Sequence, residues 1–342
     1  MTSITIRSFL RPGLTAAFAA LVTAVLATPA AAQFNGENLL GDMGVKSGSQ
    51  PEPGVYWSNI YYRYFTDTIT DPDGRRIQID PSGKASQTIQ AGMPLLYAVS
   101  RKKVLGAHVG ALVVLPIARG SLEMPGLGLS EDVSTGLSDL YVMPLQLGWH
   151  TTRADAVAGV GFFAPTGRYA ADADDNLGRG MWSYEVSGGG TVYLDKARSL
   201  SVATTAYWET HSKKSGAVQI EHLSVTGVKV GQLLTLEGGI GKAFLHGAAS
   251  AGVAYYAQWK LTADSLGAPL PAGADVPGLP KHRVFGLGPD VTFPIATRTR
   301  LLSLVNVRYL WETGAQVKTQ GRTLMVTNTI PFGKTRIPGK GN

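Results

Sequence analysis

The chain has 342 residues, carries a formal net charge of +7 at pH 7 and contains 42 glycines but no cysteine. The missing cysteines exclude disulfide bridges and thiolate metal sites. Charged residues make up only 16% of the chain and form no basic stripe interleaved with aromatic residues, so nucleic acid is not an expected partner. Abundant glycine and sparse charge disfavour long helices and suit curved β-sheets.

The first 32 residues have the parts of an export signal. Arg7 and Arg11 supply positive charge, residues 14–27 form an apolar run, and Ala30–Ala32 offers a small-residue cleavage site before Gln33. The apolar run is shorter than the roughly 20 residues that a membrane-spanning helix needs. We expect residues 1–32 to be a cleaved signal peptide and the mature chain to be exported.

Residues 33–53 form a segment of different character. They contain Gly, Pro and Ser together with a short apolar patch at Leu39, Leu40 and Met43. This composition predicts a flexible N-terminal segment with room for one helical turn. Because it precedes a predicted barrel, we consider it a candidate plug for the barrel lumen.

Twelve segments with strand character follow. They are residues 55–65, 86–99, 105–118, 139–150, 154–165, 182–194, 200–210, 228–243, 247–260, 283–295, 301–313 and 323–332. Short turns alternate with long links between them, as in outer-membrane proteins, whose periplasmic turns are short and whose outer loops are long. The sequence therefore predicts an all-β fold, a transmembrane antiparallel up-and-down β-barrel over residues 54–334, with both termini in the periplasm and a tail at 335–342.

The strand count has one alternative. Residues 220–225 also have strand character, and a barrel of 14 strands is the competing prediction. A strand at this position would put the short and long links out of step, so we place it in a loop of a barrel with about 12 strands.

Period-2 alternation in the hairpin over residues 136–169 indicates two different faces. One face of its first strand carries Tyr141, Met143, Leu145, Leu147 and Trp149. These large apolar residues are expected to face lipid. The opposite parity, with small and polar residues, is expected to line the lumen.

The same parity argument gives two sets of site residues. The tryptophans near strand ends share the apolar parity of their strands and predict a membrane girdle: Trp149, Trp182, Trp208, Trp259 and Trp311. Charged and polar residues of the other parity are predicted to line the lumen of a channel: His108, His150, Glu185, Glu209, Lys229, Glu237, Lys260, Asp290, Asn306, Arg308 and Glu312. Arg308 and Glu312 share a face four residues apart, so we expect them to neutralise each other in part.

The sequence resembles a known family. GLSDL at 136–140, LGWH at 147–150 and APTGRY at 164–169 are similar to outer-membrane proteins grouped as "meta-pathway of phenol degradation". The resemblance implies an outer-membrane barrel that acts as a porin-like transporter for apolar or aromatic compounds. Its motif residues here are Trp149, His150, Pro165, Thr166, Gly167, Arg168 and Tyr169. Arg168 and Tyr169 either anchor the outer loop, which we favour, or contact cargo.

Motifs of catalysis are missing from the sequence. No G-x-S-x-G nucleophile elbow is present, and the six histidines have no paired metal-ligand spacing. Acidic residues cluster at 172–175, which we interpret as a turn rather than a calcium site. We therefore predict no catalytic residue, no metal and no cofactor.

Three functions remain. The first is passive uptake of small apolar or aromatic compounds through the Gram-negative outer membrane. The alternatives are a lipase-like outer-membrane enzyme and a structural barrel without a transport role. The expected partners are outer-membrane lipid, lipopolysaccharide and the solute, and the sequence does not fix the oligomeric state.

Overall fold

The computed structural model describes residues 34–332 except 171–172, 174, 221–222, 268–280 and 298–299. The predicted signal peptide at 1–32, its cleavage site before Gln33 and the tail at 335–342 lie outside the described residues. None of the described helices is long and apolar enough to cross a membrane.

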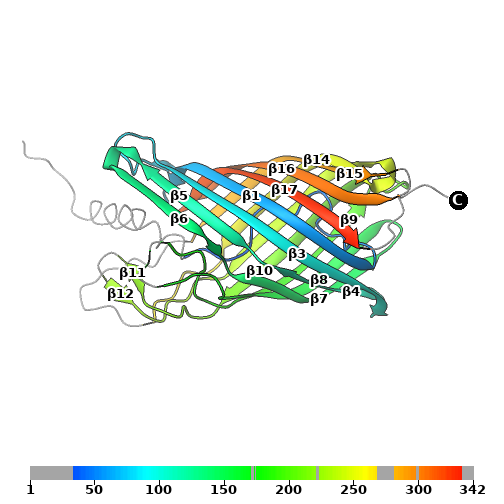
Figure 1. The fold of residues 1–342 in the computed structure, drawn as a ribbon, viewed down its shortest axis with the longest axis horizontal. Coiled ribbons are helices and arrows are strands. Elements are labelled where there is room, and N and C mark those ends of the chain that lie inside the picture. Colours follow the sequence, from blue (N-terminus) through cyan, green and yellow to red (C-terminus); the bar gives the residue numbers. More distant parts are fainter. Residues whose placement is uncertain are drawn as a thin grey trace, which may run out of the picture.

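A closed antiparallel β-barrel of 12 strands forms the body of the protein (Figure 1). The wall strands are β1 (Gly54–Thr70), β3 (Ser86–Val104), β4 (Ala107–Val114), β7 (Leu140–His150), β8 (Ala154–Ala164), β9 (Ser183–Tyr193), β10 (Leu200–His211), β13 (Leu233–Phe244), β14 (Ala249–Lys260), β15 (Arg283–Ala296), β16 (Leu301–Gln316) and β17 (Thr319–Phe332). Closure comes from β1, which pairs with β17 on one side and with β3 on the other. The predicted fold class and the count of 12 are confirmed.

Three short strands lie at the end of the barrel where the long connections gather. The two-residue β2 (Arg76–Ile77) pairs with the end of β1. β11 (Val218–Ile220) and β12 (Leu223–Val225) form a separate two-stranded sheet. Ile220 and residues 223–225 are therefore outside the barrel wall, as the alternation of connections required. Two short 3-10 turns, η1 (Pro125–Leu127) and η2 (Leu245–Gly247), complete the elements.

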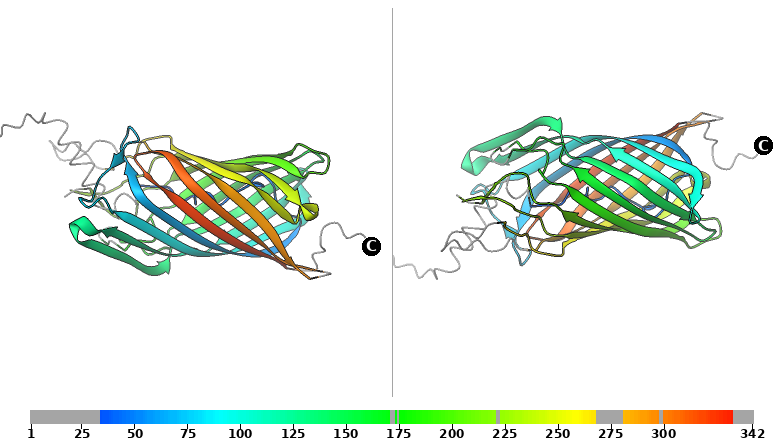
Figure 2. Two further views of the ribbon diagram at one scale, coloured as in Figure 1. Left: turned by 90° about the horizontal axis from the view of Figure 1, so that it is seen from above. Right: turned by 90° about the horizontal axis from the view of Figure 1, so that it is seen from below.

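The single strand predicted over 105–118 is instead two strands, and the second of them continues beyond residue 118. It consists of β4 and β5 (Ile117–Met124), which pair with successive parts of β3. The break falls at Pro116, which has no N–H to donate to the ladder. The long connection predicted between residues 118 and 139 contains most of β5 and all of β6 (Leu129–Leu137). These two strands form a hairpin that extends beyond the barrel wall (Figure 2).

A bulge in β7 makes part of the predicted lipid face wrong. The pairing of β7 with β8 shifts register between Val142 and Leu145, and such a bulge moves later side chains to the opposite face. Tyr141 donates a hydrogen bond to Glu185 inside the barrel, and Met143 is buried. Only the part of the hairpin after the bulge has Leu145, 41% exposed, on the outward face.

Other strand bounds differ in smaller ways. β13 begins at Leu233, not at residue 228. The turn expected between the strands predicted at 86–99 and 105–118 lies at Leu105 and Gly106, which both have positive φ (52° and 79°), the backbone that two-residue hairpin turns require. The N-terminal segment contains turns but no helix among its described residues.

Candidate functional site

The N-terminal segment, residues 34–53, runs through the lumen from one end of the barrel to the other. At the long-loop end, Lys260 on the last position of β14 donates its Nζ to the carbonyl of Phe34 (2.9 Å). At the short-turn end, the Ser49 hydroxyl donates to Asp155 on β8 (2.8 Å). The barrel itself begins at Gly54 and ends at Phe332, which both lie at the short-turn end. The first and last wall strands therefore share one end of the barrel, whereas Phe34, the first described residue, lies at the opposite end.

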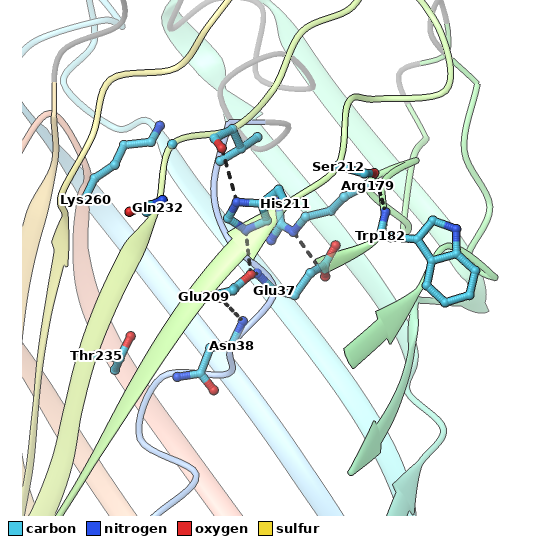
Figure 3. Close-up of polar contacts among 12 residues, drawn as sticks. Glu37, Asn38, Arg179, Trp182, Glu209, His211, Ser212, Gln232, Thr235 and Lys260 are labelled. Atoms are coloured by element: carbon cyan, nitrogen blue, oxygen red, sulfur yellow. Dashed lines mark hydrogen bonds and ion pairs between the residues drawn. The ribbon is translucent and has the colours of Figure 1, made fainter. Parts of the chain in front are cut away.

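Glu209 on β10 holds the segment near the long-loop end. Its two carboxylate oxygens accept the backbone N–H groups of Glu37 (2.7 Å) and Asn38 (3.2 Å). His211 lies two residues further along the strand and contacts the same carboxylate through Nε2 (2.7 Å). Figure 3 shows these contacts, with the Glu37 side chain turned toward Arg179 (3.3 Å).

Glu237 and Arg308 hold the segment at mid-lumen. Glu237 on β13 accepts the N–H groups of Gly41 and Met43, each at 2.9 Å. Arg308 on β16 donates to the carbonyl of Gly41 (2.6 Å) and forms an ion pair with Asp290 (2.8 Å). The wall thus binds the backbone of the segment through charge-assisted hydrogen bonds, which are stronger than neutral ones.

Asp155 organises the short-turn end of the lumen. It is buried and accepts hydrogen bonds from Ser49, Tyr193 (2.6 Å) and Arg198 (2.6 Å). The His150 ring nitrogen Nδ1 lies 3.1 Å from the same carboxyl group. The His108 ring is 6.4 Å from the His150 ring, so both predicted histidines lie near this end.

Two glycines permit the close fit of the segment. A Cβ on Gly44 would lie 1.8 Å from the Asp290 carboxylate, and one on Gly41 would lie 2.4 Å from Leu310. Gly41 also has a φ of +84°, which side chains disfavour. Leu40 from the predicted apolar patch packs against a buried cluster that contains Tyr256 and Leu310.

Most predicted lumen residues lie on the inner wall. Seven of them are buried: Glu185, Glu209, Glu237, Lys260, Asp290, Arg308 and Glu312. Asn306 donates to Asp290 (2.6 Å). Lys229 differs, because it is exposed and lies ahead of β13 in isolated bridges with Lys213 and Ser265.

The expected partnership of Arg308 with Glu312 is wrong. Arg308 pairs with Asp290, whereas Glu312 accepts hydrogen bonds from Tyr64 (2.8 Å) and Tyr256 (2.6 Å). Residues on neighbouring strands lie closer together than residues four apart on one strand. Asp290 on the neighbouring β15 pairs directly with Arg308, and Tyr64 and Tyr256 reach Glu312 from β1 and β14, each two strands away.

The predicted girdle tryptophans lie toward the two ends of the barrel. Trp182, Trp208 and Trp311 are 43%, 37% and 53% exposed, and Figure 3 shows Trp182 directed away from the lumen. Trp259 packs edge-on against Phe285. Trp149, at the opposite end, donates its indole N–H to the carbonyl of Leu105 (3.0 Å).

The family-motif residues 165–169 connect the loop after β8 to β6 and to the start of β7. Thr166 accepts the N–H of Leu140 (3.0 Å), and Gly167 donates to Asp139 (2.9 Å). Arg168 forms an ion pair with Asp175 (3.0 Å) and donates to the carbonyl of Ser134. These contacts show loop anchoring.

Tyr169 and Lys214 lie together at the long-loop end. The Lys214 Nζ is 5.4 Å from the centre of the Tyr169 ring and donates to the carbonyl of Arg179 (2.6 Å). Burial lowers the pKa of the Lys214 ammonium to about 7, and the nearby Arg179 charge contributes in the same direction. An uncharged Lys214 is thus favoured above neutral pH.

Asp139 and Asp155 are site residues that the sequence analysis missed. Asp139 is buried and accepts the N–H of Arg179 (2.7 Å) as well as that of Gly167. It lies within the GLSDL motif of residues 136–140, and this motif is the feature of the sequence that indicates its importance. Asp155 is on the inward parity of β8, which it shares with apolar and small residues. Strict use of strand parity therefore predicts that it lines the lumen.

The described residues contain no group of three or more potential metal ligands. Asp172 and Asp174 of the predicted acidic turn lie outside the described part, while Asn176 there bonds the backbone of Ala170 and Ala173. His108, His150, His211 and His282 contact carboxylates, carbonyls or Lys318. No serine hydroxyl is bonded to these four described histidines.

The family model described as "MetA-pathway of phenol degradation" matches residues 66–327. The chain belongs to this family. The resemblance seen in the sequence is therefore confirmed over most of the barrel. No curated protein matches the chain.

One solved structure supports the fold, and a second is less similar. An outer membrane channel from Pseudomonas putida F1 is similar with a TM-score of 0.68 at 15% identity, covering 86% of this chain and 100% of that one. The transport unit of the autotransporter AIDA-I from Escherichia coli gives a TM-score of 0.48 at 11% identity, over 91% and 97% of the two chains. The first likeness establishes an outer-membrane type of barrel.

Proposed function

We propose that the protein is a channel of the Gram-negative outer membrane for passive uptake of small apolar or aromatic compounds. In this proposal residues 1–32 are removed as a signal peptide, and the short-turn end faces the periplasm. The solute class follows the description of the family, and the route follows the fold, which is shared with a protein described as an outer membrane channel.

The observation that carries the proposal is the occupied lumen. Residues 34–53 contact wall residues from Lys260 at one end to Asp155 at the other. A barrel of 12 strands is narrower than the 16-stranded porins with open aqueous pores, and the segment narrows it further. We propose that the segment is a plug that must shift for a solute to pass. Such a plug favours selective passage over bulk diffusion of hydrophilic molecules.

A tether between the plug and the wall tests this directly. The chain contains no cysteine, so Val45→Cys with Gly241→Cys introduces a single possible disulfide. A Cβ at Gly241 would lie 2.8 Å from the Val45 Cβ, about 1 Å closer than the usual disulfide spacing, so the segment must move away from the wall by roughly that distance for the bond to form. The oxidised and reduced forms of this one variant are then compared by liposome swelling with small aromatic compounds, alkanes and sugars.

Reduced protein should admit aromatic compounds faster than sugars, and oxidation should slow their entry several-fold. Each single-cysteine variant serves as the control for oxidation itself. Equal aromatic flux in both states would show that the plug need not move. Swelling with sugars alone would instead reject the solute class.

A further inference from the structure

Three arginines lie on the outward face of the barrel near its long-loop end. Arg63 on β1, Arg119 on β5 and Arg322 on β17 are all exposed. Their strands are consecutive in the order β17, β1, β3, β5. We call Arg63, Arg119 and Arg322 the arginine patch.

Register shows how compact the patch is. Arg63 pairs directly with Gln90 on β3, and Gln90 pairs directly with Arg119 on β5. Since adjacent strands lie about 4.8 Å apart, the backbones of Arg63 and Arg119 are separated by roughly 10 Å. On the other side of β1, Arg322 pairs with Phe65, two residues beyond Arg63. All three side chains can therefore reach a shared region above β1 and β3.

The partners of these arginines leave their charge uncompensated. Arg119 donates its Nε to the Gln90 side chain (2.7 Å), and the Arg322 guanidinium lies 4.7 Å from the centre of the Phe65 ring. Among the described residues, no ion pair includes any of the three. Asp132 pairs with Ser121, two residues from Arg119, while Asp67 and Glu123 lie four residues from Arg63 and Arg119 toward the loop end.

Depth in the wall identifies the environment of the patch. Arg322 pairs with Trp311, one of the exposed tryptophans near the long-loop end. The next row toward the short-turn end is apolar, with Tyr61 beside Val326 and Ile117 across Gly92. The arginines therefore lie where the apolar band ends, at the depth of lipid headgroups, where an outward arginine is tolerated far better than at the bilayer midplane.

We propose that the arginine patch is a docking surface for the phosphate groups of lipid A, the membrane anchor of lipopolysaccharide. Under the orientation of the proposed function, on which this inference rests, the long-loop end faces the leaflet that contains lipopolysaccharide. Arginine forks bind phosphate oxygens in pairs. Two or three guanidinium groups over a span of roughly 10 Å match a lipid with two separate phosphates better than one with a single phosphodiester.

The first experiment uses the unmodified barrel in detergent micelles. Diphosphoryl lipid A, monophosphoryl lipid A and phosphatidylglycerol are titrated separately, and the temperature of unfolding is followed by heat-modifiable gel mobility. Diphosphoryl lipid A should raise this temperature most, and phosphatidylglycerol least. Equal shifts for all three lipids would overturn the proposal, because they would show only a general preference for anionic lipid.

The second experiment removes the patch. The variant Arg63→Gln/Arg119→Gln/Arg322→Gln should bind diphosphoryl lipid A on the order of tenfold more weakly, since each tenfold corresponds to about 1.4 kcal/mol of lost contacts. The matched control Arg101→Gln/Lys102→Gln/Lys103→Gln loses the same charge at the opposite end of β3 and should bind normally.

Retained binding in the patch variant, or an equal loss in the control, would contradict the assignment. If the patch variant does not fold, the three single variants and the lipid comparison on the unmodified barrel still test whether the arginine patch binds lipid A. Neither experiment measures transport. A failure here therefore leaves the channel proposal standing, and a failed swelling assay leaves the lipid A proposal standing.

Discussion

At the scale of single residues, the lumen is built from carboxylates that accept backbone N–H groups. Glu209, Glu237 and Asp290 come from three different strands and bind successive parts of the N-terminal segment. Such contacts do not depend on the side chains of the segment. They instead require that it approach the wall closely, which explains glycine at 41 and 44.

Arg308 is the residue whose loss should loosen the plug most. Arg308→Ala removes the hydrogen bond to the Gly41 carbonyl and leaves Asp290 buried without its cation. Breaking one side of a buried pair typically costs about 3–5 kcal/mol, whereas removing both charges costs less. We expect Arg308→Ala to lower the unfolding temperature and to increase solute flux. The double variant Arg308→Ala/Asp290→Asn should recover part of the stability but keep the increased flux.

Val307 is next to Arg308 on β16 but is on the opposite, lipid-facing side of the strand, so its substitution should affect folding and not flux. Val307→Arg should cost roughly 2–4 kcal/mol if it lies near mid-membrane, and it should leave flux through folded barrels unchanged. Gel mobility and liposome swelling separate the two effects. A silent Val307→Arg would show that the faces of β16 are assigned in reverse.

Lys214 gives a pH-dependent prediction. Its pKa falls from 10.5 to about 7 in the folded protein, so the unfolded chain binds more protons between these values. Stability therefore rises with pH across this window, and the penalty is complete below about pH 7. The variant Lys214→Met has no titratable group at this position, so this contribution to the pH dependence of stability is lost. The urea midpoint of the variant minus that of the wild type should decrease from pH 7 to pH 10, and a constant difference would contradict the burial of a charged Lys214.

At the scale of elements, regular strands were predictable and irregular ones were not. Parity placed Glu185, Glu209 and Glu237 on one wall because β9, β10 and β13 are free of bulges where they pair. In β7 the bulge after Val142 reverses the faces, so strand parity assigns Tyr141 and Met143 to the wrong side. The β5–β6 hairpin was missed because its exposed, polar alternation resembles a loop as much as a strand.

This hairpin should be dispensable for closure of the barrel. Ser121 and Asp132 pair directly, so residues 122–131 can be replaced by an Asn-Gly turn that suits a two-residue hairpin. We expect this variant to keep heat-modifiable mobility, because the pairing of β1 with β3 and β17 is untouched. An equally long replacement of residues 148–157, between the paired Leu147 and Ala158, shortens two wall strands and should abolish folding.

At the scale of the whole molecule, the barrel was readable from the sequence but the path of its N-terminal segment was not. Strand parity and alternating connection lengths are local signals repeated 12 times, and together they specify a closed sheet. Residues 34–53 have no such periodicity. Their position depends on contacts with residues far along the chain, such as Glu37 with Glu209 and Val45 with Asp290.

The orientation of the barrel, on which both proposals depend, can be tested in the cysteine-free background. Asp73 is exposed in the turn between β1 and β2 at the long-loop end, and Lys196 is exposed in the short turn between β9 and β10. On intact cells, an impermeant thiol reagent should label Asp73→Cys and should label Lys196→Cys only after the outer membrane is permeabilised. The reverse result would mean that the long-loop end faces the periplasm. The arginine patch would then meet phospholipid rather than lipopolysaccharide, and the plug would open from the opposite side.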